Sequence, residues 1–133
     1  MRTYVVGRTV KGDVLAWVDV DGENRPLSHV RHHSENFEYG YGGSGPADLA
    51  LSILADHFGE ELDARSLSEG GWYVPDAPGG EFIPSRALQL CHQFKAAFVA
   101  RRPRELPWRV TAAEIDAWIE GLATPSADGY PIL

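Results

Sequence analysis

The chain has little cysteine, no long apolar run and, over a long central stretch, almost no positive charge. Its one cysteine, Cys91, cannot form a disulfide within the chain, which favours a reducing compartment, and we expect the cytoplasm. No apolar run approaches the ~20 residues of a membrane-spanning helix, and Gly7 and Arg8 interrupt the apolar start. We therefore expect neither a membrane partner nor a signal peptide.

The composition is that of one globular domain. The 133 residues are 44% hydrophobic and 23% charged, and this length suits one hydrophobic core rather than two. We predict a single domain over residues 1–133, with its core in residues 3–122 and an extended C-terminal tail over 123–133.

The charges are divided along the chain. The net charge is −7. Residues 32–81 hold ten acidic residues and one basic residue, Arg65, whereas residues 85–110 hold six basic residues and one acidic residue, Glu105. Two interpretations stay open: the two segments neutralise each other, or they form an acidic and a basic face that each dock a charged partner.

The hydrophobic pattern predicts an α+β fold that begins with strands. Residues 3–10 and 14–20 are rich in β-branched and aromatic residues and are separated by a short turn, as in a hairpin. A third strand is predicted over residues 27–31, and at most a short one over 37–39. We expect an N-terminal antiparallel sheet of three to four strands, packed by three α-helices.

The three helices are predicted from periodicity and capping residues. Pro46 suits the first position of a helix that ends at Gly59, with Gly45 as its cap and Asp48 facing the positive end of the helix dipole. A second helix is predicted to start at Pro84 and to end near residues 101–103. Thr111 and Glu114 form a capping box that starts the third helix.

A glycine-rich turn precedes the first of these helices. Residues 40–45 match the GxGxxG pattern of dinucleotide-binding turns, but no long buried strand comes before them. The Lys and Ser/Thr of a phosphate-binding loop are missing, since Pro46 and Ala47 follow. A tight turn that packs the helix closely is the leading interpretation, and an anion site on the backbone N–H groups is the alternative. The residues of that alternative are Gly42, Gly43, Ser44 and Gly45.

The nucleophilic and imidazole side chains form no complete catalytic or metal-binding pattern. Ser44 could act as a nucleophile only with His57 or His92 as base and Asp76 to orient it, in a chain much shorter than hydrolases of that type. The histidines of residues 29–33 match no zinc spacing and are interpreted as a solvated loop. We therefore predict no catalytic residue, no metal site and no cofactor.

A basic segment near the C-terminus is the candidate partner-binding region. It contains four arginines and a tryptophan, a combination that binds proteins or the bases and phosphates of nucleic acids. The residues are Arg101, Arg102, Arg104, Trp108 and Arg109.

Three segments together resemble a known family. They are residues 37–54, which include Gly-Tyr-Gly-Gly-Ser-Gly-Pro-Ala-Asp-Leu-Ala-Leu-Ser-Ile-Leu, then residues 93–95, then residues 108–119. In these segments the chain is similar to small uncharacterised bacterial and phage proteins with domain of unknown function 6166. The resemblance covers most of residues 3–122 and implies an accessory protein of a phage or mobile element, without assigning a role to any residue.

Three functional hypotheses follow. The first is a non-enzymatic accessory protein that docks a macromolecular partner, most simply a protein, with inhibition of a host defence system such as CRISPR-Cas as one form of that role. The second is a module, with or without enzymatic activity, that binds a small anion or a nucleotide at Gly42–Gly45. The third is nucleic-acid binding through residues 101–109.

Overall fold

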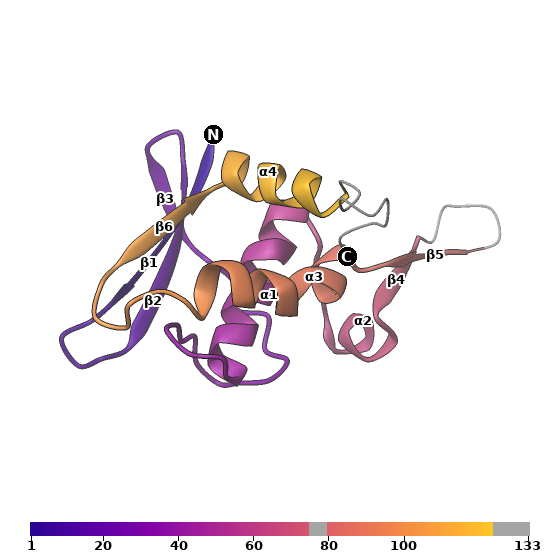
Figure 1. Ribbon diagram of the computed structural model, residues 1–133. Coiled ribbons are helices and arrows are strands. Elements are labelled where there is room, and N and C mark those ends of the chain that lie inside the picture. The colour runs from indigo at the N-terminus through magenta and orange to yellow at the C-terminus, as the bar shows by residue number, and fades with distance from the viewer. Residues whose placement is uncertain (75–79, 124–133) are drawn as a thin grey trace, which may run out of the picture.

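The chain folds into a four-stranded antiparallel sheet with helices packed against one of its faces (Figure 1). The computed structural model describes residues 1–74 and 80–123, so most of the predicted C-terminal tail lies outside the described residues. The strands are β1 (Arg2–Arg8), β2 (Val14–Val20), β3 (Glu23–Pro26) and β6 (Trp108–Thr111), and their order in the sheet is β3-β2-β1-β6. The predicted α+β class is confirmed.

The N-terminal hairpin is confirmed, but the third strand lies earlier than predicted. Asp21 (φ 53°) and Gly22 (φ 89°) are both left-handed, which suits a two-residue hairpin turn. The chain therefore turns back at once, and Glu23 already pairs with Val20. Pro26 ends the strand, and residues 27–31 leave the sheet, so the strand predicted there is wrong.

The fourth strand comes from the far end of the chain. Residues 37–39 form no strand, although Phe37 and Tyr39 are buried. The edge beside β1 is instead taken by β6, in which Trp108 and Val110 point into the core while Arg109 points outward. This alternation is too short to have been distinguished from a loop by sequence pattern alone.

Four helices and a second hairpin complete the fold. Helix α1 (Ser44–Phe58) is central, and α3 (Arg86–Phe94), which continues into the π-helical turn η1 (Lys95–Val99), packs against it. Helix α4 (Ala112–Ala123) follows β6 directly, after the predicted capping box of Thr111 and Glu114. The short helix α2 (Ala64–Glu69) leads into a hairpin of β4 (Gly71–Val74) and β5 (Glu81–Pro84).

Two predicted helix starts are corrected. Pro84 is the last residue of β5, and Ser85 caps α3 by accepting a hydrogen bond from the backbone N–H of Leu88. Helix α1 begins at Ser44 with Gly43 as its cap, two residues before the predicted start, because Ala47 already donates to the carbonyl of Gly43. Pro46 still lies in the first turn, where its missing N–H costs little.

The core lies between the inner face of the sheet and α1. Tyr4, Val6, Val18 and Val110 from the sheet are fully buried in one cluster with side chains of α1, α3 and α4. Every residue of α1 from Gly45 to Ala55 is buried. A helix enclosed on all sides must find partners for any polar side chain that it carries.

Candidate functional site

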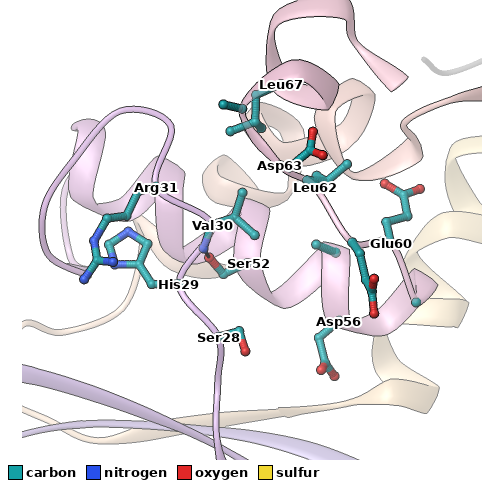
Figure 2. Close-up of a pocket in the computed structure, with 14 residues that line it drawn as sticks. Ser28, His29, Val30, Arg31, Ser52, Asp56, Glu60, Leu62, Asp63 and Leu67 are labelled. Carbon is teal, nitrogen blue, oxygen red and sulfur yellow. Dashed lines mark hydrogen bonds between the residues drawn. The ribbon is translucent and has the colours of Figure 1, made fainter. Parts of the chain in front are cut away.

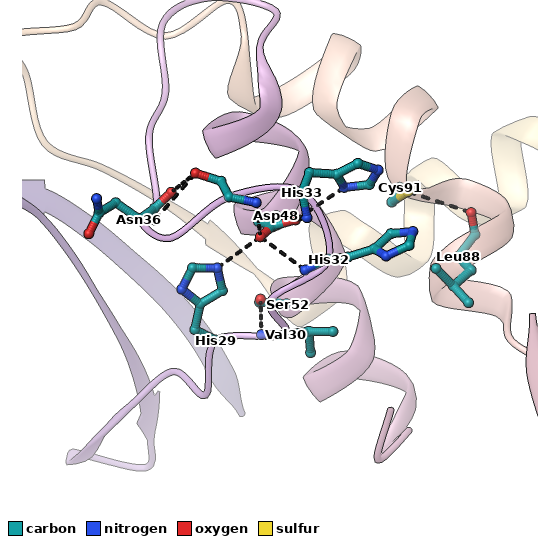
Figure 3. A network of polar contacts seen from close by, with 10 residues as sticks. His29, Val30, His32, His33, Asn36, Asp48, Ser52, Leu88 and Cys91 are labelled. Carbon is teal, nitrogen blue, oxygen red and sulfur yellow. Dashed lines mark hydrogen bonds and ion pairs between the residues drawn. The ribbon is translucent and has the colours of Figure 1, made fainter. Parts of the chain in front are cut away.

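The polar side of α1 holds a loop rather than facing solvent. Asp48 and Ser52 lie one turn apart on this helix, and both are buried. The Asp48 carboxylate accepts hydrogen bonds from the backbone N–H groups of His32, His33 and Ser34, at 3.2, 2.8 and 3.0 Å. One turn later, the Ser52 hydroxyl accepts one from the N–H of Val30 at 2.8 Å. Residues 30–34 are thus fixed to α1 by their backbone (Figure 3).

Two imidazoles complete the surroundings of Asp48. His29 Nε2 lies 3.0 Å from Oδ2 of Asp48, and His33 Nδ1 lies 3.1 Å from Oδ1. Burial by itself would raise the pKa of the Asp48 carboxyl. The hydrogen bonds from His29 and from the backbone of residues 32–34 outweigh that effect, and the pKa lies below its ordinary value. The carboxylate therefore stays charged in the core because five donors surround it.

This arrangement corrects two predictions. Asp48 lies beyond the first turn of α1 and does not serve the helix dipole, since the helix begins earlier than predicted and has no acidic residue in its first turn. The histidine loop is not simply solvated, because the rings of His29 and His33 contact the buried carboxylate. The four-residue spacing of Asp48 and Ser52 was the available signal, but a polar side of a helix normally indicates solvent.

Three imidazoles gather where this loop meets α3. The ring centroids of His32 and His33 are 4.2 Å apart, and those of His33 and His92 are 5.8 Å apart. The pKa of His92 is lowered by burial and by the nearby Lys95, His33 and His32. Cys91 beside it is buried, and that burial raises the pKa of its thiol. Within residues 1–74 and 80–123, no three potential metal ligands are already placed to hold one ion.

An open pocket of about 710 Å³ lies between the histidine loop and the segment that follows α1 (Figure 2). Asp56, Glu60 and Asp63 line it together with the apolar side chains of Val30 and Leu62. These three carboxylates already have partners within the chain. Asp56 binds the hydroxyl of Tyr4 and the guanidinium of Arg25, both at 2.7 Å.

Glu60 and Asp63, which also line the pocket, bind the N-termini of two helices. Glu60 binds the Ser85 hydroxyl at 2.6 Å and the backbone N–H groups of Arg86 and Ala87 at the N-terminus of α3. Asp63 caps α2 through the N–H of Ser66. Three of the four pocket carboxylates thus stabilise the fold, the fourth being Glu61, and this leaves the three less free to act as acids or bases.

Among the described residues, no hydrogen bond joins Ser44 to His57 or to His92, the two candidate bases. His57 pairs with Asp116 of α4 at 2.7 Å, and its side chain is 5% exposed. Asp76 lies outside the described residues. Ser44 is exposed at the start of α1.

Some residues of the glycine-rich turn are needed for packing, and others are exposed to solvent. A Cβ on Gly45 would lie 2.8 Å from Cβ of Glu38 and 3.2 Å from the carbonyl oxygen of Asn36, so this residue must be small for α1 to pack. Gly42 and Ser44 are exposed, and the cap residue Gly43 has no side-chain hydrogen bond to the helix. An anion site here stays a prediction.

The structure brings this turn into contact with the basic segment. Gly40 donates to the carbonyl of Val99 at 3.1 Å, and a Cβ on Gly40 would overlap the side chain of Arg104. The Tyr41 ring covers Gly43 on one side, and the Arg104 guanidinium lies 5.4 Å from its centroid. We call the exposed residues of these two segments, Tyr41, Gly42, Ser44, Arg101 and Arg104, the Tyr41–Arg104 surface.

The other predicted partner-binding residues lie at different depths. Trp108 is 7% exposed and belongs to the core, and Arg102 packs over its ring while donating to the carbonyl of Phe98. Arg109 is exposed on the outer face of the sheet, in a cross-strand row with Val5 and Trp17. Arg102 is thus largely structural, whereas Arg101, Arg104 and Arg109 are exposed.

The acidic and basic segments do not neutralise each other through ion pairs in the described part of the chain. Glu38 pairs with Arg8 of β1 at 2.9 Å, and Asp56 pairs with Arg25 beside β2. The ion pairs described for residues 1–74 and 80–123 leave out all four arginines between residues 101 and 109. The positive charges of Arg101, Arg104 and Arg109 are therefore unpaired by these ion pairs and exposed at the surface.

The fold and these contacts define a small α+β protein in which Asp48, a carboxylate of the central helix, holds a neighbouring loop in place. A family model for a family of unknown function, DUF6166, matches residues 4–70, and the chain belongs to this family. No curated protein and no solved structure matches the chain. Among the described residues, no helix combines the length and the apolar character needed to cross a membrane.

Proposed function

We propose that this protein is a non-enzymatic binding protein that docks a macromolecular partner through the Tyr41–Arg104 surface. The observation that carries the proposal is the contact of Tyr41 with both Gly43 and Arg104, which joins two residues 63 positions apart in sequence into one exposed patch. Exposed tyrosine and arginine are the residue types that contribute most to binding at protein interfaces. The partner that fits is a protein with an acidic patch.

The carboxylates of the large pocket interact mostly with other groups of the chain, and this favours a binding role over an enzymatic one. Three of the four carboxylates that line the large pocket, Asp56, Glu60 and Asp63, hold backbone N–H groups, hydroxyls or arginines of the chain itself. Catalytic acids and bases need a proton-transfer position that is open to substrate. Arg101 and Arg104, by contrast, are exposed and have no carboxylate partner among the described residues.

Charge reversal on this surface tests the proposal. The double variant Arg101→Glu/Arg104→Glu leaves the structural Arg102 in place, and Arg65→Glu on α2 reverses an exposed arginine elsewhere. Immobilised protein is used to capture partners from a lysate of its natural host, and each captured protein is then titrated against the three forms. We expect the double variant to bind at least ~10-fold more weakly, with the Arg65 variant unchanged. Equal binding by all forms would refute the proposed surface.

Two alternatives have their own readouts. If nucleic acid is the partner, retention on heparin and on DNA falls in the double variant and the binding is steeply salt-dependent. A small-anion site at Gly42–Gly45 would shift the amide signals of these residues when inorganic phosphate is added. We also propose that the protein is an accessory protein of a phage or mobile element and that it inhibits a host defence system. The types of the neighbouring genes test this: phage or defence genes would support it.

A further inference from the structure

The imidazole of His33 lies near those of His32 and His92, and the three residues come from two separate elements. His32 and His33 belong to the loop fixed to α1, and His92 lies on α3. Their rings lie in a chain of contacts, with centroid distances of 4.2 Å between His32 and His33 and 5.8 Å between His33 and His92. In Figure 3 the rings of His32 and His33 both extend from the loop toward the helix that carries Cys91.

His33 is oriented as metal-binding histidines are. Its Nδ1 lies 3.1 Å from the buried Asp48 carboxylate, and this contact leaves Nε2 for another partner. A histidine that binds a metal through one ring nitrogen usually donates its other N–H to a carboxylate, which fixes the ring and makes the free nitrogen more basic. Asp48 also binds the backbone N–H groups of His32 and His33, so the loop has a fixed position relative to α3.

The charges around the three imidazoles are mixed. Lys95 is the one permanent cation among these groups, and it lies one turn along from His92. A bound metal ion has to compete with this charge, whereas the Asp48 carboxylate behind His33 offsets it.

We propose that His32, His33 and His92 bind a divalent transition-metal ion that prefers imidazole, such as Zn²⁺. The three rings do not already surround one point in the described residues, and the site closes by side-chain rotation of His32 and His92. Both residues are exposed, so their side chains can change rotamer without disturbing the core. Three protein ligands leave a fourth position of a tetrahedral Zn²⁺ ion for water or for a ligand from outside.

The site is tested by titrating untagged protein with ZnCl₂ in a calorimeter at pH 7.5, and with CoCl₂ by visible absorption. The variants are His92→Gln and His32→Gln, and the control is His57→Gln, whose histidine lies on the other end of α1 against Asp116. We expect one ion per chain, with affinity at least ~10-fold lower in each of the first two variants and unchanged in the control. Circular dichroism checks that all forms are folded.

Two results would overturn the proposal. One is the absence of saturable binding by the wild-type chain. The other is equal affinity in wild type and His92→Gln, which would place the ion elsewhere. Neither result bears on the Tyr41–Arg104 surface, because that surface contains no histidine.

Discussion

At the scale of single residues, Asp48 has the largest structural role of the polar side chains described above. A charged group that is fully enclosed stabilises a fold only when its hydrogen bonds are all in place. Asp48 meets this condition with three backbone N–H groups and two imidazoles. Its sequence position, on the polar side of a predicted amphipathic helix, indicated solvent instead, because a periodic pattern cannot reveal a loop that returns from elsewhere.

We predict that Asp48→Asn destabilises the protein by about 3 kcal/mol at neutral pH, since the amide has one acceptor oxygen in place of two and carries no charge. The free energy of unfolding is measured by urea denaturation. Asp116→Asn is the matched control. Asp116 is exposed and pairs with a single histidine, so that change should cost less than ~1 kcal/mol. Similar losses in the two variants would contradict the central role of Asp48.

At the scale of elements, the glycines around the start of α1 differ in how closely they are packed. Gly45 lies against Cβ of Glu38 and the carbonyl of Asn36, whereas a Cβ on Gly42 would have no atom within 4 Å. In the same glycine-rich run, Gly45 must therefore lack a side chain for α1 to pack, whereas Gly42 has room for one. The sequence motif alone treats the two alike.

We predict that Gly45→Ala lowers the free energy of unfolding by about 1–3 kcal/mol, because the added methyl group forces the 36–38 segment away from the helix. Gly42→Ala should change it by no more than ~0.5 kcal/mol. Thermal and urea unfolding of both variants provide the comparison. If Gly45→Ala is as stable as wild type, the favourable helix propensity of alanine outweighs the clash, and the packing argument fails.

The elements with strong local signals were predicted correctly, and those that depend on distant contacts were not. The hairpin of β1 and β2 and the Thr111–Glu114 capping box follow from neighbouring residues. Strand β6 forms because β1 offers an unpaired edge, which no local pattern shows. The same holds for the proposed Tyr41–Arg104 surface: the sequence points to the glycine turn and to the arginines separately, but their contact through Tyr41 is a tertiary feature.

At the scale of the whole molecule, the charge distribution has a structural origin. Acidic side chains of the central segment pair with arginines of the N-terminal strands, as in Arg8 with Glu38 and Arg25 with Asp56. These pairs join the sheet to the segments around α1. Arg101, Arg104 and Arg109 take part in none of the ion pairs among the described residues and are exposed, although the net charge of the protein is −7.

The family match covers residues 4–70, but the core extends well beyond them. Phe94, Val99, Val110 and Ile115 are fully buried in the same cluster as the side chains of α1. Helix α1 is buried on all sides, and α3 and η1 provide one of its covers. A chain that ends after β4 would keep β1, β2 and β3 but would expose this side of α1 and the edge of β1.

We therefore predict that a fragment of residues 1–74 does not fold by itself. Losing large core side chains costs several kcal/mol each, and a domain of this size is stable by only ~5–15 kcal/mol in total. The measurements are a thermal scan by circular dichroism and a proton–nitrogen correlation spectrum, with the full chain as control. We expect no cooperative transition and little dispersion of the amide signals. A cooperative unfolding transition in the fragment would show instead that the matched region is an independent folding unit, to which α3, β6 and α4 are additions.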